Sequence, residues 1–347
     1  MLKILAPKGE VFPYIESAKR YLEAGAEANV SDYFEVVRNQ QTPIQVVWQY
    51  DGENAEKFLV QYARKEDFSD AITVETAGEE RSADLYNLYK SSDYFVRVTA
   101  YNKQGEVLES AEGGFQTTSL GPRVMNIEGV CNVRDFGGWK TMDGKTIVQG
   151  IAYRGGSPMP LPRDPLDTVI TDMGKAYMRD TLGVRTELDL RSAEESGIYG
   201  EGVIPGVKLV YKTINGYDAA MKEPERFREV FKFFADKNNY PMYYHCTAGS
   251  DRTGTVTFLL RMLLGMSEFD SIKDHEFSSF SIYGERNTKT GESGEWFHWF
   301  YDRLQAEYEG KTTQEKTVNY LRSIGVTEEE MSNIKGIFLG EILIKQP

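Results

Sequence analysis

The feature that most constrains the fold of this chain is a change in the spacing of its apolar residues near residues 119–122. From about residue 42 to residue 118, apolar residues alternate with polar ones or gather in short bursts, and turn-forming segments such as 51–54 and 102–105 separate them. After Pro122, short apolar strands alternate with segments of helical spacing. Short strands separated by turns predict a β-sandwich, whereas alternating strands and helices predict an α/β domain with a mostly parallel sheet. The sequence therefore predicts a multidomain chain.

Three parts are expected: a lead-in strand and helix over residues 1–40, an all-β sandwich over 41–120, and an α/β domain over 121–347. Residues 13–25 have helical spacing, and we expect this helix to pack on the sandwich. In the α/β part, helical spacing covers four segments: 223–236, 253–265, 296–308 and 327–340. Thr327 and Glu330 form a capping box at the start of the last segment.

Composition excludes several classes of protein. The net charge of −13 argues against binding to nucleic acid or to an anionic membrane, because both would repel such a surface. Two cysteines, Cys131 and Cys246, are too few for a disulfide framework, so free thiols are expected. No apolar run approaches the roughly 18–20 residues of a membrane span, and the first residues do not have the pattern of a signal peptide. A cytoplasmic protein and an exported one with a trimmed signal both fit, and the oligomeric state is left open.

The segment with the clearest chemistry is 245–254, His-Cys-Thr-Ala-Gly-Ser-Asp-Arg-Thr-Gly, which lies between an apolar strand and an apolar helix. A loop in this position directs backbone N–H groups into an anion cradle at a helix N-terminus. The cradle and the helix dipole favour negative charge, so Cys246 is expected to be a thiolate. Arg252 offers a planar fork for two phosphate oxygens. Gly249 allows the backbone to turn close to a ligand, and Thr253 can donate its hydroxyl to the sulfur.

This Cys-x5-Arg loop resembles the signature of the protein tyrosine phosphatases, and the whole string is similar to their bacterial tyrosine/serine and lipid phosphatase branch. Further matches follow in the order of that family, at 132–138, 153–156, 188–195, 274–281 and 320–330. The resemblance implies a two-step reaction through a phosphocysteine on Cys246, with no metal or other cofactor. In such a site, Arg252 and the loop amides stabilise the charge on the phosphoryl oxygens.

The resemblance also implies roles for individual residues. Cys246, Arg252 and Asp251 are the expected catalytic groups, with Asp251 the first choice for the general acid and Asp135 the second. The expected substrate contacts are Thr247, Ala248, Gly249, Ser250, Thr253 and Asp135. Asp251 could instead cap the helix, and Asp135 could pair with a neighbouring arginine. The branch usually has lysine at position 250, so Ser250 removes a positive charge and favours mono-phosphorylated substrates over inositol polyphosphates.

Other polar and aromatic residues have structural explanations as well as functional ones. Structural roles are expected for four residues: Cys131, Arg154, Arg191 and His245. Trp139 is equally well explained as a platform for substrate or as part of the core. His275 and His298 lack the spacing of metal ligands, so no metal site is expected.

The sandwich resembles the fibronectin type III family over about 80 residues. Leu88 precedes Tyr94 by six residues, Val96 and Val98 alternate after it, and a turn follows at 102–105. In that family, the tyrosine lies near the corner that leads into the penultimate strand.

Hydrolysis of phosphotyrosine, with phosphoserine and phosphothreonine as further substrates, is the function that the sequence favours. The expected partner is a phosphorylated protein or a small phosphomonoester, without nucleic acid or membrane contact. A phosphoinositide or inositol-polyphosphate phosphatase is an alternative, which Ser250 and the acidic charge disfavour. A catalytically weak phosphate-binding or adhesion module is a second, which the intact Cys246, Asp251 and Arg252 disfavour.

Overall fold

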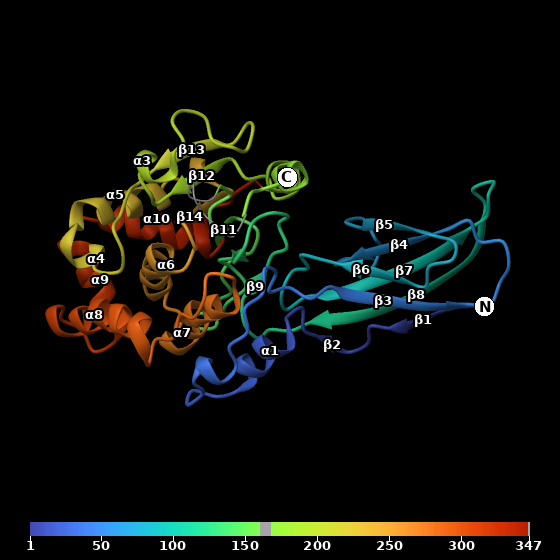
Figure 1. The fold of residues 1–347 in the computed structure, drawn as a ribbon, viewed down its shortest axis with the longest axis horizontal. Helices are drawn as coiled ribbons and strands as arrows, with labels where there is room; N and C mark the ends of the chain where they lie inside the picture. Colours follow the sequence, from blue (N-terminus) through green and yellow to red (C-terminus); the bar gives the residue numbers. More distant parts are fainter. Residues whose placement is uncertain (160–167, 346–347) are drawn as a thin grey trace. The chain divides into compact units, whose positions relative to one another are not determined.

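The computed structural model describes residues 1–159 and 168–345. The chain divides into two compact units (Figure 1). The first consists of Met1–Ile15 and Gln41–Leu120, and the second consists of Glu16–Gln40 and Gly121–Pro347. Residues 16–40 therefore interrupt the first unit in sequence but belong to the second. No helix within the described ranges is long and apolar enough to cross a membrane.

The first unit is a sandwich of two sheets. The three-stranded sheet has the order β1-β3-β6 and contains β1 (Leu2–Ala6), β3 (Ile44–Tyr50) and β6 (Ser82–Leu85). The five-stranded sheet has the order β2-β8-β7-β4-β5 and contains β2 (Glu10–Val11), β4 (Lys57–Ala63), β5 (Ile72–Ala77), β7 (Asp93–Tyr101) and β8 (Val107–Thr117). Strand β1, which the sequence placed in a separate lead-in region, pairs with β3 and is part of the sandwich.

Alternation along the strands places the apolar side chains in the sandwich core. On β7, Tyr94, Val96 and Val98 are buried, and they pack in one cluster with Phe58 of the adjacent strand β4 and with Trp48 of β3 in the other sheet. The hydroxyl of Tyr94 accepts a hydrogen bond of 2.8 Å from the backbone N–H of residue 89. This bond joins the start of β7 to the corner before it, which is the arrangement known as a tyrosine corner.

The second unit is built on a six-stranded sheet with the order β13-β12-β14-β11-β10-β9. Its strands are β9 (Arg123–Val124), β10 (Arg134–Asp135), β11 (Ala152–Gly155), β12 (Thr186–Asp189), β13 (Lys208–Tyr211) and β14 (Met242–His245). The four strands from β13 to β11 are parallel, and β10 and β9 extend the sheet in antiparallel fashion. His245 at the end of β14 is in register with Asp189 and Gly155 at the ends of its neighbours. The carboxyl ends of three parallel strands thus meet where the loop after His245 begins.

Helices and short turns surround this sheet (Figure 1). They are α1 (Glu16–Glu23), η1 (Val30–Asp32), α2 (Asp172–Ala176), η2 (Tyr177–Thr181), α3 (Ala193–Ser196), α4 (Ala219–Lys222), α5 (Pro224–Phe234), η3 (Lys237–Asn239), α6 (Asp251–Leu263), α7 (Glu268–Glu276), η4 (Phe277–Phe280), α8 (Gly291–Glu307), α9 (Thr313–Ser323) and α10 (Glu328–Phe338). The four segments of predicted helical spacing fall on α5, α6, α8 and α10. The capping box of Thr327 and Glu330 is present at the start of α10. Every residue of α6 from Thr253 onward is buried, which makes it the central helix of the unit.

Helix α1 packs within the second unit. Its buried Tyr21 lies against Phe280, with ring centroids 5.8 Å apart, and donates a hydrogen bond to Glu276. The side chain of Gln40 donates to the backbone carbonyl of Phe277 at 2.9 Å. The prediction that this helix packs on the sandwich is therefore wrong. Its apolar face covers aromatic residues more than 200 positions away, which helical spacing alone cannot identify.

Candidate active site

The loop over residues 246–250 joins the end of β14 to the start of α6. Cys246 at its base is only 2% exposed. Gly249 has φ of +68°, and a Cβ atom there would lie 2.1 Å from the carbonyl oxygen of Gly155, so this position requires glycine. Ser250 is the N-cap residue of α6, but its side chain makes no capping hydrogen bond. The backbone N–H groups of the first turn are thus left to bind an anion.

Arg252 is fixed by an ion pair with Glu195 of α3. Its Nη1 and Nη2 donate to the two carboxylate oxygens at 2.7 and 2.6 Å. Ser192 caps α3 by accepting a hydrogen bond from the backbone N–H of Glu195 at 3.1 Å, which holds the carboxylate in place. Burial opposes the charge of Arg252, but the bonds to Glu195 and the neighbouring Cys246 raise its pKa. Its Nε makes no hydrogen bond to the described residues, so the Nε edge is left for two oxygens of a ligand.

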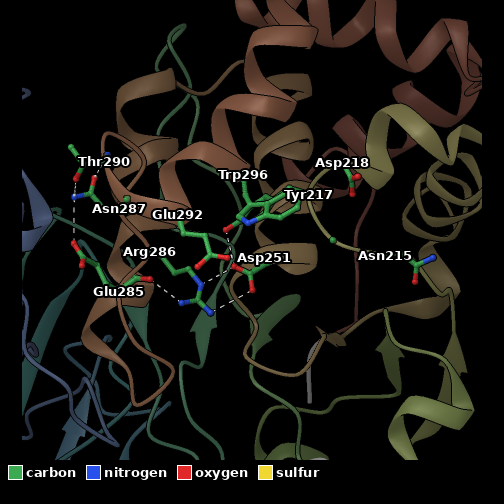
Figure 2. Close-up of a pocket in the computed structure, with 12 residues that line it drawn as sticks. Asn215, Tyr217, Asp218, Asp251, Glu285, Arg286, Asn287, Thr290, Glu292 and Trp296 are labelled. Carbon is green, nitrogen blue, oxygen red and sulfur yellow. Dashed lines mark hydrogen bonds and ion pairs between the residues drawn. The ribbon is translucent and has the colours of Figure 1, made fainter.

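Asp251 is fixed by two donors from other parts of the chain, as Figure 2 shows. Its Oδ1 accepts hydrogen bonds from the Tyr217 hydroxyl and from Nε of Arg286, both at 2.7 Å. Nη2 of Arg286 lies 3.4 Å from the second oxygen, Oδ2. Nη1 of Arg286 donates to backbone carbonyls of its own loop, at Tyr283 and Glu285. The guanidinium therefore joins that loop to Asp251.

His275 stands behind this arrangement. It is buried, and burial together with the charge of Arg154 lowers its pKa to about 3, so the ring is neutral near pH 7. Its Nε2 lies 3.2 Å from the hydroxyl of Tyr217. Because the Tyr217 hydroxyl donates its hydrogen to Asp251, it must accept a hydrogen bond from Nε2–H of the neutral His275 ring. The result is a chain of donors from His275 through Tyr217 to Asp251.

His245 directly precedes Cys246, and its surroundings favour the charged form of its ring, whereas those of His275 favour the neutral form. Its Nε2 lies 2.9 Å from a carboxylate oxygen of Glu187, and its Nδ1 lies 2.9 Å from the carbonyl oxygen of Cys246. Burial opposes the charged form, but Asp189 and Glu187 raise the pKa above its ordinary value. Both acceptors match a protonated ring. Arg191 also pairs with Asp189, through Nη2 at 2.8 Å. These contacts are consistent with the structural roles that the sequence predicts for His245 and Arg191.

Three buried arginines surround Asp274 beneath the loop. Nη1 of Arg154 lies 3.0 Å from the carboxylate, Nη1 of Arg261 lies 2.8 Å from it, and Nε of Arg134 lies 3.9 Å from it. Burial opposes ionisation of Asp274, but the three cations lower its pKa well below the usual range. Arg154 also donates from Nη2 to the carbonyl oxygen of Gly249 at 2.7 Å. The cluster therefore braces the loop and places excess positive charge beside it.

A cavity of about 630 Å³ opens beside Asp251 (Figure 2). Its walls come from residues 215–218, from residues 285–287 and from the start of α8. Tyr217 and Trp296 supply aromatic surface, and Trp296 is 48% exposed. Arg286 is the one cation among the described residues of the wall, and the carboxylates there are Asp218, Asp251, Glu285 and Glu292. The cavity therefore combines aromatic surface with negative charge.

Comparison with known proteins places this chain in a family. Residues 125–340 match the tyrosine phosphatase family, and residues 30–113 match the fibronectin type III domain. The chain belongs to the tyrosine phosphatase family. The second unit is accordingly its phosphatase domain, and the sandwich is a fibronectin type III domain.

Two bacterial proteins are similar in sequence to this phosphatase-family chain. One, from Cupriavidus necator and provisionally named a tyrosine-protein phosphatase, is 28% identical over 172 residues, which cover 42% of this chain and 59% of that protein. The other, a tyrosine-protein phosphatase of Nostoc commune, is 23% identical over 217 residues, which cover 49% of this chain and 74% of that protein. The chain thus spans less than two thirds of the first relative.

Solved structures also match parts of the chain. The core catalytic domain of a PP-IP phosphatase from S. cerevisiae matches 45% of this chain and 83% of its own, with 17% identity and a TM-score of 0.29. The fibronectin type III domain of human contactin 1 matches 24% of this chain and 72% of its own, with 25% identity and a TM-score of 0.19. These TM-scores are too low to support a conclusion about fold or substrate.

The structure brings most of the predicted site residues together in the loop after β14 and in the first turn of α6, from Cys246 to Thr253. Ser250 is fully buried, however, and its hydroxyl lies 3.3 Å from Nδ2 of Asn132 and 3.4 Å from the carbonyl of Ala248. It is therefore placed to hold the loop, and its side chain does not line the cavity. The hydroxyl of Thr253 is buried and makes no hydrogen bond to the described residues. In the described chain, no group of three or more His, Cys, Asp or Glu is placed to hold a metal ion.

Asp135 has its hydrogen-bond partners outside the loop. Its carboxylate is fully buried and accepts hydrogen bonds from Arg123 at 2.8 Å and from the backbone N–H groups of Gly137 and Gly150 at 2.8 and 2.7 Å. Burial raises its pKa. These are the contacts of a structural ion pair, the alternative left open by the sequence, and not of a substrate-binding group. Trp139 likewise lies in the core, with Arg261 5.2 Å from its ring.

Sequence reasoning missed three residues that hold the candidate catalytic groups. Glu195 lies within a matching segment, but nothing in its spacing pointed to Arg252. Tyr217 and Arg286 are 34 and 35 positions from Asp251 and belong to no recognised pattern. No local signal in one sequence identifies such partners, because the fold alone brings them together.

Proposed function

We propose that this chain is a phosphomonoester hydrolase that acts through a phosphocysteine on Cys246, with phosphotyrosine in proteins as its main substrate. The observation that carries the proposal is the arrangement around the loop. Cys246 lies at the base of an uncapped helix N-terminus, and Arg252 is held by Glu195 with its Nε edge left for a phosphate. A thiolate nucleophile needs this combination of an oriented cation and backbone donors.

In the proposed reaction, the sulfur of Cys246 attacks phosphorus and the bond from phosphorus to the leaving oxygen breaks. Asp251 gives its proton to that oxygen. Water then attacks the phosphocysteine, Asp251 takes a proton from the water, and the sulfur–phosphorus bond breaks to release phosphate. Arg252 and the loop amides bind the phosphoryl oxygens in both steps. The position of Asp251 in the cavity wall supports its role, because the leaving group would lie in that cavity.

The cavity favours a substrate that has an aromatic leaving group and a single phosphate. Tyr217 and Trp296 offer surface for a phenyl ring. Asp218, Glu285 and Glu292 would repel further phosphates, which disfavours inositol polyphosphates. The preference is thus assigned to the cavity wall and not to the side chain of Ser250, which is buried elsewhere. Phosphoserine and phosphothreonine fit the same chemistry with less aromatic contact.

The test replaces the nucleophile. We expect Cys246→Ser to abolish turnover of para-nitrophenyl phosphate in the presence of EDTA, while vanadate still binds, because the amide cradle and Arg252 remain. Unaltered protein is compared in parallel on phosphotyrosine peptides, phosphoserine peptides and inositol phosphates. Substantial hydrolysis by the Cys246→Ser variant would exclude the thiol mechanism. A higher kcat/KM on inositol phosphates than on phosphotyrosine would replace the proposed substrate with the alternative one.

A further inference from the structure

One of the two residues that fix Asp251, Arg286, lies on a loop that is held by a distant part of the chain. Residues 281–290, here called the Arg286 loop, carry the guanidinium that pairs with Asp251. Residues 16–40, here called the lead segment, lie between strands β2 and β3 of the sandwich in sequence but pack within the phosphatase domain. Hydrogen bonds connect the lead segment to the Arg286 loop.

One set of these bonds joins the middle of the lead segment to the residues on either side of Arg286. The amide nitrogen of the buried Asn287 lies 2.6 Å from Oδ1 of Asn29 and 2.7 Å from the hydroxyl of Ser31. The same hydroxyl donates to Glu285. Lys289 donates to the backbone carbonyls of residues 26 and 28, at 2.8 and 3.0 Å. Ser31 therefore bonds both neighbours of Arg286 in sequence, and Asn29 bonds one of them, Asn287.

A second set passes through a buried carboxylate. Glu276 accepts a hydrogen bond from the hydroxyl of Tyr21 on α1, and its other oxygen accepts from the backbone N–H and the hydroxyl of Thr288 at 2.9 and 2.6 Å. Lys273 donates to the carbonyl oxygens of Tyr21 and residue 24, at 3.0 and 3.1 Å. Tyr21 and Glu276 are both buried. The Arg286 loop is thus held from two directions, and hydrogen bonds to buried charged groups are among the stronger ones.

We propose that the lead segment is a positioning element of the general acid: through the Arg286 loop it sets the place of Arg286, and through Arg286 the place of Asp251. This inference rests on the function proposed above. Asn29, Ser31 and Arg286 are positioning residues in it, because none of them needs to touch the substrate. Both ends of the lead segment are covalently continuous with the fibronectin type III domain, so that domain is tied in sequence to the element that orients the acid.

The proposal has a kinetic signature that separates positioning from general stability. An acid is needed most when the leaving oxygen is basic, as in tyrosine, whose hydroxyl has a pKa of about 10. It is needed least for para-nitrophenol, which leaves as a stable anion. A displaced Asp251 should therefore slow phosphotyrosine hydrolysis more than para-nitrophenyl phosphate hydrolysis. Partial unfolding would reduce both rates by the same factor.

The experiment removes the bonds to the Arg286 loop in the full chain. We expect Asn29→Ala combined with Ser31→Ala to lower kcat on a phosphotyrosine peptide about 10-fold and on para-nitrophenyl phosphate less than about 2-fold, since a whole general acid contributes roughly 10²–10⁴-fold. KM should change little. Ser17→Ala is the matched control, because its hydroxyl bonds Glu35 within the lead segment at 2.6 Å. Lys289→Met, at an exposed position, serves as a second variant if the double variant does not fold.

The same substitutions in an Asp251→Asn background complete the test. With the acid removed, the lead-segment variants should cause no further loss on phosphotyrosine, because their effect acts through Asp251. Equal losses on both substrates, or a full loss that persists in the Asp251→Asn background, would overturn the inference and leave the proposed function standing. Failure of the unaltered protein to hydrolyse either substrate would instead overturn the proposed function, and the inference with it.

Discussion

Two consecutive residues in the first turn of α6, Asp251 and Arg252, are held by ion pairs of opposite polarity whose partners come from different parts of the chain. Arg252 pairs with Glu195, and Asp251 pairs with Arg286, with similar exposed fractions of 15% and 32% in the first pair and 35% and 19% in the second. Glu195 lies on α3, the first helix after strand β12, and is fixed by the local cap of Ser192. Arg286 lies on a loop that depends on residues more than 250 positions away. The proposed phosphate-binding side of the site is thus built near the sheet, and the side of the proposed acid is built from residues far away in sequence.

Removing the lead segment should have the largest effect, because the side of the site around Asp251 depends on it and the side around Arg252 does not. A fragment over 121–347 lacks Tyr21, which removes a ring packed against Phe280 and the hydrogen-bond donor to one of the two oxygens of Glu276. Loss of a buried aromatic side chain alone costs about 3–5 kcal/mol, a large part of the roughly 5–15 kcal/mol that stabilises a domain. We expect this fragment to be insoluble or to unfold at a markedly lower temperature than the full chain. Its thermal unfolding can be followed by circular dichroism.

The control protein keeps the lead segment. It lacks residues 1–15, and a Gly/Ser linker between residues 40 and 121 replaces residues 41–120. This protein should fold and hydrolyse para-nitrophenyl phosphate, because every residue of the candidate site is retained. If the shorter fragment is equally stable, the lead segment is dispensable for folding. If neither folds, the two units of the chain depend on each other.

Arg252→Lys tests the phosphate-binding side directly. Lysine keeps the charge but cannot make an end-on pair with Glu195 and also present a second edge to phosphate. We expect kcat/KM to fall at least about 10²-fold on every substrate, the scale of one lost oxyanion donor. Steady-state kinetics with both aryl phosphate and phosphotyrosine would measure this. A near-normal kcat would show that Arg252 has only a structural role.

Glu195→Gln should have a smaller effect on the same side. The amide keeps the shape of the carboxylate but accepts only one hydrogen bond from the guanidinium, so Arg252 is less firmly held. We expect a loss of about 10-fold in kcat/KM, the scale of one charge-assisted hydrogen bond, with the same factor for good and poor leaving groups. That uniformity distinguishes it from the lead-segment variants. Glu194→Gln, which changes the exposed neighbour, should leave the kinetics unaltered.

The contrast between the two sides also explains what the sequence could predict. The loop from His245 to Thr253, with its strand and helix, is one continuous string, so its chemistry was readable from spacing and turn residues. The sandwich fold could be predicted for the same reason, because the alternation of apolar residues and the turn residues are local features of the sequence. The position of α1 and the roles of Tyr217 and Arg286 were not, since they depend on contacts between segments far apart in sequence. Asp135 shows the reverse case, because a residue in a matching segment has the contacts of a structural ion pair.

Each side of the loop has one buried histidine, and pH should affect the two in opposite ways. The folded pKa of His275, about 3, lies below the ordinary value of 6.5. Between these values the unfolded chain binds a proton that the folded chain does not, so its contribution to stability is present above pH 6.5 and is lost as pH falls. For His245 the folded pKa is raised, so its contribution is present at low pH and is lost as pH rises through that value.

His275→Gln isolates the first of these effects. Glutamine can still donate an amide hydrogen toward Tyr217, but it does not titrate. The free energy of unfolding, measured with urea between about pH 4 and pH 6.5, should decline less steeply on acidification in this variant than in the unaltered protein, by at most about 1.4 kcal/mol per pH unit. Titrating carboxylates affect both proteins alike, so the difference between the slopes reports His275. Identical slopes would mean that His275 is not held neutral, and the donor chain to Asp251 would then need another description.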